Sequence, residues 1–445
     1  MRRSRVLAIA ATLALTGGAV VTHTTTATAD EAGVAVDFTR PTAQIETGDI
    51  GVTITGYGGL NYIVNSEDHR KALAAHGFDT MRIELRYETP GDHDSRIICG
   101  GDSCHKDYDG DTWMSAIRDK MNATPILVVP ADADDAVSLY EHFAATGTVP
   151  KVIVGNELDA GNPPRMDAAT YAGVFNEIAT RIHAADASVQ VGGPGTAHNN
   201  IGYLRTFLEK SGEHVDFVDY HDYGMGETRL PDAQLLAEAA NYERDIAEVR
   251  TLIDSTVPNG SDVGIQIGEW NMDHGDKSPA CSSMTSHLPT VWGAAALGTM
   301  LESEATALLF GDKNGCLGLT GEWGEGQGED FVDINKPMPI SHGVGMFTGE
   351  GLFRPFGTTM VATSTSDDLL YVFASADDKN IVVVNTATTE TSTAMSFTGL
   401  DSGTAEVWQT TNAQRVPHRA GTADISGGGM TATLPARSVT TFVVG

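Results

Sequence analysis

Residues 152–159 read VIVGNELD, a run of apolar, β-branched residues that ends abruptly in the glutamate Glu157. Residues 265–271 read IQIGEWN and have the same form, with Glu269 at the end of the run. Near-continuous apolar runs are typical of strands that are buried on both faces, as in a parallel sheet. A carboxylate at the end of such a strand lies at the mouth of the sheet. The two stretches therefore predict a pair of carboxylates that face one site.

Six further runs of strand length lie around these two stretches. Together the eight runs cover residues 52–57, 80–86, 125–130, 151–155, 189–193, 215–220, 263–268 and 305–310. Segments with apolar residues at helical spacing alternate with them, at residues 66–75, 111–121, 133–145, 168–185, 203–210, 232–253 and 290–301. This alternation over residues 50–350 predicts a (β/α)8 TIM barrel. A doubly wound open sheet is the competing fold, but the even number of strands and the missing Gly-rich phosphate loop favour the barrel.

Residues 351–445 follow a different pattern. Short Thr- and Val-rich runs are separated by Gly, Asp and Ser, at residues 369–374, 380–385, 393–397, 405–409, 429–434 and 438–444. This pattern is typical of a β-sandwich. We expect the N-terminal segment 30–49, with its strand-like stretch 34–38, to join that sandwich. The predicted architecture is thus α/β, a barrel followed by a C-terminal β-sandwich domain.

Residues 1–29 have the features of a secretory signal peptide. Three arginines within the first five residues precede a mostly apolar stretch, and Ala27-Thr28-Ala29 fits the small-x-small cleavage pattern. A membrane anchor is the alternative, but the apolar stretch is too short for a spanning helix. We expect a secreted, extracellular protein whose mature chain starts near Asp30.

Charge and cysteine content limit the possible partners and the redox state. The net charge of −31 argues against nucleic acid and anionic membranes as partners. An even number of cysteines in a secreted chain predicts two disulfides, one within the loop of Cys99 and Cys104 and one that joins Cys281 to Cys316. The alternative, a zinc site, lacks CxxC spacing and clustered histidines. No pattern indicates an oligomeric state.

The two glutamates occupy positions at which barrel enzymes carry their catalytic residues, namely the C-terminal ends of the strands. Glu157 follows the fourth predicted strand and Glu269 the seventh, on opposite sides of the barrel mouth. Paired carboxylates cleave glycosidic bonds. They do so with retention when about 5–5.5 Å apart and with inversion when about 6.5–9.5 Å apart.

The pair Asn156-Glu157 on strand four, together with Glu269 on strand seven, resembles the clan A retaining glycoside hydrolases. The resemblance implies that Glu157 is the acid/base and Glu269 the nucleophile. It also implies that Asn156 bonds the sugar 2-hydroxyl.

Two further segments resemble family 39 of that clan. Residues 191–194 read VGGP, and residues 215–223 read VDFVDYHDY, similar to the family's DFVS-x-H-x-Y segment. The resemblance covers the whole barrel and the trailing sandwich. At strand four this chain reads GNEL where family 39 reads WNEP, and the Gly-Asn-Glu form is similar to family 79, the glucuronidases and heparanase-like enzymes.

Polar residues near the strand ends are further candidates for the substrate site. The resemblance implies that either His221 or Tyr223 forms a hydrogen bond with Glu269. Alternatively, His221 is a structural histidine at the rim of the barrel. Arg82 lies inside the second predicted strand and needs an anionic partner, either a catalytic carboxylate or a structural one such as Glu84.

Three aromatic residues are candidates for stacking on a sugar, namely Trp270, Trp323 and Tyr57. Trp270 directly follows Glu269 and could equally belong to the core. Trp323 lies in the long Gly-rich loop after the eighth predicted strand, and long loops in compact domains are often functional.

Together with the resemblance, these observations predict a secreted retaining glycoside hydrolase that acts by double displacement on plant-type polysaccharide or oligosaccharide side chains. The family 39 resemblance makes xylosyl or arabinofuranosyl units the first choice. We expect no metal or organic cofactor, and we expect partial burial and the charge of Glu269 to raise the pKa of Glu157. The alternatives are a glucuronidase or galactosidase of the same clan, a catalytically inactive carbohydrate-binding protein, and a metal-dependent barrel hydrolase.

Overall fold

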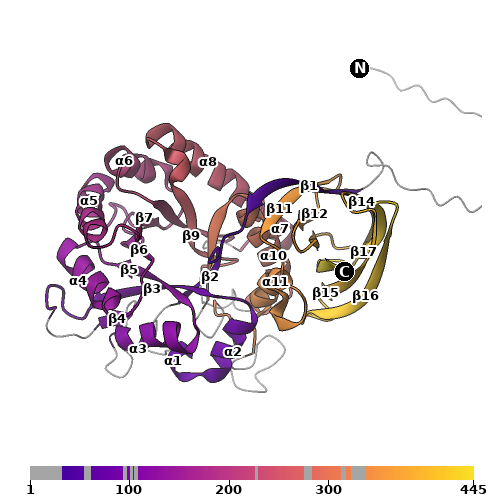
Figure 1. Cartoon of the computed structure of the whole chain (residues 1–445), viewed down its shortest axis with the longest axis horizontal. Coiled ribbons are helices and arrows are strands. Elements are labelled where there is room, and N and C mark those ends of the chain that lie inside the picture. Colours follow the sequence, from indigo (N-terminus) through magenta and orange to yellow (C-terminus); the bar gives the residue numbers. More distant parts are fainter. Residues whose placement is uncertain are drawn as a thin grey trace, which may run out of the picture.

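The chain forms a closed parallel barrel and a second, mostly antiparallel sheet (Figure 1). The computed structural model describes residues 33–54, 62–93, 98–100, 104, 109–225, 229–274, 283–311, 317–321 and 336–445. Tyr57, Trp323, Cys281 and Cys316 therefore lie outside the described residues, as do residues 1–29. Within the described ranges, no helix combines the length and the apolar character that crossing a membrane requires.

Eight parallel strands make up the barrel, and each follows the previous one around the ring. They are β2 (Ile50–Ile54), β3 (Thr80–Tyr87), β5 (Thr124–Val129), β6 (Lys151–Val154), β7 (Gln190–Thr196), β8 (Phe217–Tyr223), β9 (Gly264–Asn271) and β10 (Ala305–Phe310). Pairing of β2 with both β10 and β3 closes the ring. A short strand, β4 (Ile98–Gly100), pairs antiparallel with the end of β3, and Cys99 in it is disulfide-bonded to Cys104. The predicted barrel is confirmed.

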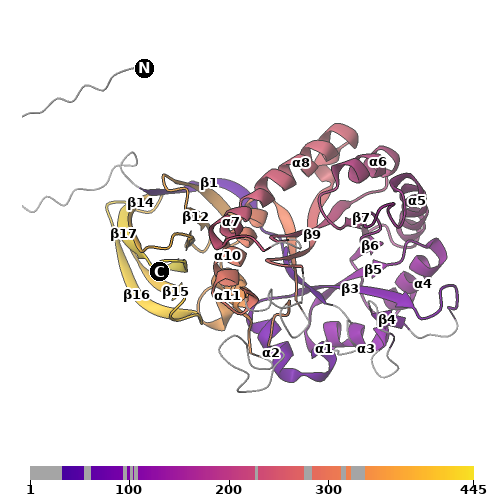
Figure 2. The ribbon, with the colours of Figure 1, turned by 180° about the vertical axis from the view of Figure 1, so that it is seen from behind.

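Helices cover the outside of the barrel (Figures 1 and 2). They are α1 (Tyr62–Asn65), α2 (Glu67–Ala75), α3 (Gly110–Ser115), the π-helix η2 (Ala116–Lys120), α4 (Ala133–Ala144), α5 (Ala168–Ala185), α6 (Ile201–Ser211), α7 (Asp232–Glu238), α8 (Asn241–Thr256), the 3-10 helix η3 (Gly260–Asp262), α10 (Leu288–Glu302) and α11 (Pro339–Thr348). Ser66 caps α2 by accepting a hydrogen bond from the backbone N–H of His69. The single helix expected over residues 232–253 is wrong, because α7 ends before Ala239 and α8 starts after Ala240. Alanine favours helices, so apolar spacing alone could not show this break.

The second sheet has nine strands in the order β11-β1-β14-β17-β16-β15-β18-β13-β12. They are β1 (Val34–Gln44), β11 (Thr359–Thr365), β12 (Leu370–Ala374), β13 (Asn380–Asn385), β14 (Thr391–Thr398), β15 (Ser402–Thr410), β16 (His418–Ser426), β17 (Gly429–Leu434) and β18 (Ser438–Val444). β1 pairs with β11 and β14, so the N-terminal strand belongs to this sheet. A bridge between Met360 and Ser375 brings the two ends of the sheet together around an apolar core of its own. Neither β11 nor β16 was expected from the sequence. Most residues of β16 are polar and partly or fully exposed, so this strand has no apolar run.

Helices α10 and α11 lie between the barrel and the second sheet (Figures 1 and 2). Nearly every residue of α10 is buried, as expected for a helix that is apolar on all sides. Gly298 of α10 packs so closely on Phe373 of β12 that a Cβ at this glycine would lie 2.5 Å from the Phe373 Cζ. Thr441 of β18 donates a hydrogen bond to the backbone oxygen of Met346 in α11 (2.8 Å). The two units therefore share a packed interface.

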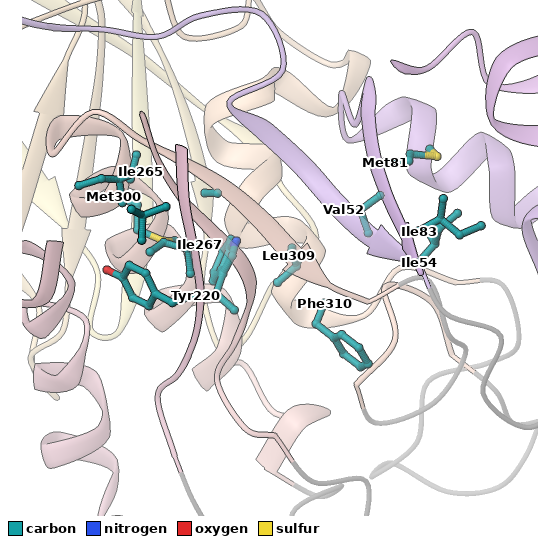
Figure 3. Close-up of a cluster of buried hydrophobic side chains, with 14 of the residues drawn as sticks. Val52, Ile54, Met81, Ile83, Tyr220, Ile265, Ile267, Met300, Leu309 and Phe310 are labelled. Atoms are coloured by element: carbon teal, nitrogen blue, oxygen red, sulfur yellow. The ribbon is translucent and has the colours of Figure 1, made fainter. Parts of the chain in front are cut away.

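Side-chain alternation along the strands divides the barrel core into two parts. Outward-facing residues pack against the helices, and Figure 3 shows members of this cluster on β2, β3, β8, β9 and β10. Inward-facing residues form a smaller apolar plug, composed of Ile126, Val128, Ile153, Phe217 and Leu308. Polar side chains replace apolar ones on the inward face toward the C-terminal ends of the strands. The polar end of the barrel interior is where the site lies.

Candidate active site

Glu157 occupies the turn that follows β6. Gly155 has φ +79° and Glu157 itself has φ +49°, a left-handed conformation that is uncommon for a residue with a side chain. The backbone N–H of Glu157 donates to the oxygen of Gly195 at 2.7 Å, which holds this turn against the end of β7. Its side chain is 31% exposed. Strained backbone of this kind persists where the surrounding structure fixes it, and it concentrates at functional sites.

A β-bulge in β9 directs Glu269 into the barrel. Tyr220 of β8 pairs with Ile267, but the next residue, His221, pairs with Glu269, so Gly268 is an extra residue in β9. Strict alternation from the inward-facing Gln266 would have placed Glu269 on the outer face. Bulges next to active sites re-aim side chains in this way.

Arg82 of β3 connects the residues at the barrel mouth. Its Nη1 donates to Glu269 Oε1 at 2.9 Å, and its Nη2 donates to Asn156 Oδ1 at 2.5 Å. The side chain is 1% exposed, so its charge has little access to water. The anionic partner that Arg82 was expected to need is therefore Glu269.

His221 lies between the two glutamates, and its contacts define its tautomer. Arg82 Nη2, which can only donate, is 3.2 Å from His221 Nε2, so Nε2 accepts and carries no proton. The proton is then on Nδ1, which donates to Glu157 Oε1 at 2.9 Å and lies 3.5 Å from Glu269 Oε2. Burial lowers the pKa of His221, but the nearby carboxylates outweigh it and raise the pKa overall. The Arg82 contact nonetheless favours the neutral ring of His221, because a protonated Nε2 would point its N–H at the N–H groups of the Arg82 guanidinium.

Both oxygens of Glu269 are held by fixed donors. Arg82 binds Oε1, and the hydroxyl of Tyr223 donates to Oε2 at 2.8 Å. A carboxylate oxygen of Glu157, a ring nitrogen of His221 and a carboxylate oxygen of Glu269 all lie within 4.8 Å of one another. These three donor atoms could in principle ligate a metal ion, but Arg82 already supplies a positive charge to the same group. The structure thus brings together Glu157, Glu269, His221, Tyr223 and Arg82, with Asn156 bound to Arg82.

The pKa of Glu157 departs from the expectation. The hydrogen bond from His221 is the largest influence and lowers the pKa, burial raises it, and the charge of Arg82 lowers it further. The net direction is downward, whereas the sequence led us to expect a raised pKa. The physical reason is that pattern analysis places Glu157 near Glu269 but does not reveal the donor and the cation beside it.

Trp270 is a core residue, which corrects its assignment as a candidate for sugar stacking. Its side chain is 1% exposed and packs against Trp292 of α10, with ring centroids 5.9 Å apart. The bulge that turns Glu269 inward turns the next residue outward, toward the helices. Trp270 therefore cannot reach a sugar in the barrel mouth.

Two buried polar residues beneath the site were missed by the sequence analysis. Asp219 Oδ1 accepts a hydrogen bond from Gln266 Nε2 at 2.7 Å, and Asp219 Oδ2 has no hydrogen-bond partner among the described residues. Burial raises the pKa of Asp219, although the charge of Arg82 lowers it. Their signal in the sequence was a polar residue between apolar neighbours, Asp219 between Val218 and Tyr220 and Gln266 between Ile265 and Ile267. Asp219, held by Gln266, lies close enough to Arg82 for their charges to interact.

Comparison with known proteins adds to this picture. No family model matches the chain, and no curated protein matches it. Solved structures do match. The chain is similar to the GH51 arabinofuranosidase from Xanthomonas axonopodis pv. citri, with 14% identity, a TM-score of 0.71, and coverage of 93% of this chain and 100% of that one.

Two further solved structures are glycoside hydrolases of other families. The GH30 endoxylanase from Clostridium papyrosolvens C71 has 14% identity and a TM-score of 0.64, with coverage of 92% of this chain and 99% of that one. The GH44 xyloglucanase from Paenibacillus polymyxa has 13% identity and a TM-score of 0.68, with the same coverage. At these identities the likeness is one of fold, and it extends over the barrel and the second sheet together.

Proposed function

We propose that this protein is a retaining glycoside hydrolase. The observation that carries the proposal is the meeting of Glu157 and Glu269, from opposite sides of the barrel, with oxygens within 4.8 Å of each other. Retaining enzymes hold their carboxyl groups about 5–5.5 Å apart, whereas inverting enzymes leave about 6.5–9.5 Å for a water molecule. The fold neighbours described as arabinofuranosidase, xylanase and xyloglucanase support the same class.

In the first step, a Glu269 oxygen attacks the anomeric carbon while Glu157 gives its proton to the departing glycosidic oxygen. The C–O bond to the leaving group breaks as the bond to Glu269 forms. Arg82 and Tyr223 hold the two oxygens of Glu269, so the nucleophile is already oriented before substrate binds. Orientation of this kind lowers the barrier without any movement of the side chain.

In the second step, Glu157 takes a proton from water, and the resulting hydroxide attacks the anomeric carbon and releases Glu269. The glycosyl ester has no negative charge, so Glu157 no longer has an anionic neighbour at the position of Glu269. Loss of a like charge favours ionised Glu157, the form that acts as a base. The hydrogen bond from His221 favours the same form.

The proposed substrates are pentosyl units of plant-type polysaccharides or oligosaccharides, arabinofuranosyl or xylosyl. The family 39 resemblance of residues 191–194 and 215–223 supports this choice. The activities named for the fold neighbours agree with it. Glucuronides and galactosides are the competing substrates, and a panel of 4-nitrophenyl glycosides that covers all four sugars separates them.

Replacement of the nucleophile tests the mechanism. Glu269→Ala is expected to abolish turnover of the best aryl glycoside, and added azide is expected to restore product with inverted configuration. Glu248→Ala, at an exposed position of α8, is the matched control and is expected to keep wild-type activity. Wild-type activity in Glu269→Ala contradicts the assignment, and absence of turnover by the wild type on all substrates favours a binding protein.

Secretion is a separate part of the proposal and rests on the pattern of residues 1–29. Expression of the full chain in a secreting bacterial host is expected to release a protein into the medium. Its N-terminal sequence is expected to begin near Asp30. Retention of the intact N-terminus on cells contradicts cleavage and supports the membrane anchor.

A further inference from the structure

A second cluster of potential metal ligands lies far from the glutamates of the active site. His76 follows α2, His342 lies in α11, and Glu350 lies in the 3-10 helix η4 (Gly349–Gly351). α2 leads into the N-terminal end of β3, so the cluster lies at the end of the barrel opposite to the active site. The three side chains are 4%, 8% and 7% exposed. Buried titratable groups from distant segments therefore meet at one point.

The hydrogen bonds of His76 show which of its nitrogens carries the proton. Nδ1 is 2.6 Å from the backbone oxygen of Ala72, which can only accept, so Nδ1 is protonated. In the neutral ring, Nε2 then has a bare lone pair. That nitrogen is buried and lies 2.9 Å from Glu350 Oε1, so either a proton or a metal ion must lie between the two atoms. A lone pair facing a carboxylate oxygen is unfavourable unless a cation is shared between them.

His342 completes the group. Its Nδ1 donates a hydrogen bond to the same oxygen of Glu350 at 2.6 Å, so a metal ion would take the place of that proton, and one donor atom from each of the three residues lies within 4.8 Å of the others. Two imidazoles and one carboxylate form a common ligand set for zinc. A metal-binding histidine usually donates its other N–H to a carbonyl or a carboxylate, as His76 does to Ala72.

The surrounding backbone is shaped to hold these three side chains. Glu350 has φ +47°, a left-handed conformation that brings its carboxylate back over α11. Gly345 of α11 leaves the space for it, because a Cβ there would lie 2.6 Å from the Glu350 Cδ. The ring of His76 is stacked on Phe78 and tilted against His342, with centroids 6.5 and 5.9 Å away. The position of each ligand is thus fixed by packing.

We propose that His76, His342 and Glu350 bind a divalent transition-metal ion, zinc in the first instance, with a water molecule as the fourth ligand. Such an ion replaces the contact between the bare Nε2 of His76 and the carboxylate with two favourable bonds. It also links α2, in the first repeat of the barrel, to α11 and η4, which lead into the second sheet. The proposal does not depend on the reaction at Glu269, since the two clusters lie at opposite ends of the barrel.

Metal analysis of the full-length chain tests the site. Protein stripped with EDTA and dialysed against zinc is expected to hold about one ion per chain. His342→Gln and Glu350→Gln are expected to lose that ion, and His418→Ala, on β16 of the second sheet, is the matched control that keeps it. Circular dichroism shows whether each variant folds.

Cobalt(II) provides a second readout that does not depend on the variants. Cobalt-loaded wild type is expected to show the d–d absorption of a tetrahedral site, and its melting temperature is expected to rise with cobalt or zinc concentration. Stripped wild type that binds no zinc and shows no cobalt spectrum overturns the proposal.

Discussion

The close packing of Gly268 in the β9 bulge predicts that a single added methyl group, as in Gly268→Ala, disturbs the active site. A Cβ at this position would lie 2.7 Å from Asp219 Oδ2 and 2.9 Å from Asp219 Cγ, where ordinary contacts begin at 3.4 Å. Asp219 is completely buried and is tethered by Gln266. It has little freedom to move away. Gly268→Ala must therefore displace β9, and the next residue along β9 is Glu269.

The size of the effect follows from the overlap. Asp219 Oδ1 would lie closer still, so relief requires a shift of roughly 1 Å, and misplacement of a catalytic group by about 1 Å can cost roughly 100-fold in rate. We expect kcat of Gly268→Ala to fall by between about 10- and 100-fold. Overpacking of this kind also costs about 1–3 kcal/mol of stability.

The assay is kcat and KM on the best aryl glycoside, together with thermal unfolding. Gly173→Ala in α5 is the control, because a Cβ there meets nothing within 4 Å. That substitution is expected to leave kcat unchanged and to stabilise the helix by about 0.5–1 kcal/mol. If Gly268→Ala has the wild-type kcat and melting temperature, the bulge does not position Glu269.

Three other substitutions test the contacts of the site. Tyr223→Phe removes a hydrogen bond to the carboxylate of Glu269, which is worth about 1.5–3 kcal/mol. We therefore expect kcat/KM to fall by about 10- to 150-fold, and an unchanged kcat/KM would show that Tyr223 does not hold Glu269 for the reaction. His221→Ala removes the donor that lowers the pKa of Glu157, so the acid form of Glu157 persists to higher pH. The pH at which kcat falls on the basic side of its pH profile is therefore expected to rise, and a decrease contradicts this role of His221. Trp270→Ala is expected to cost about 3–5 kcal/mol of stability with KM unchanged, and a large rise in KM without destabilisation would return this residue to the sugar site.

The parts of this fold that could be predicted are those written as regular patterns. Eight apolar runs between helical segments gave the barrel, and runs that end in Glu157 and Glu269 gave the two carboxylates. The order of strands then placed both at the barrel mouth. These features depend on local alternation and on the closed topology, both of which a single sequence carries.

The parts that could not be predicted depend on single-residue irregularities and on contacts between distant segments. One inserted residue, Gly268, decides that Glu269 faces inward and Trp270 outward, and no apolar pattern reveals it. The pKa direction of Glu157 depends on His221, which lies 64 residues away in the chain. The interaction of Asp219 with Arg82, and its hydrogen bond from Gln266, join residues on three strands that are far apart in the chain.

Capture of the glycosyl–enzyme tests the central claim most directly. The wild type is incubated with a 2-deoxy-2-fluoro glycoside of the sugar that it turns over, carrying a reactive leaving group, and then digested and analysed by mass spectrometry. The proposed mechanism predicts one fluorosugar per chain, attached to the peptide that contains Glu269 and absent from Glu269→Ala. An adduct on another residue, or turnover that gives a first product of inverted configuration, would contradict it.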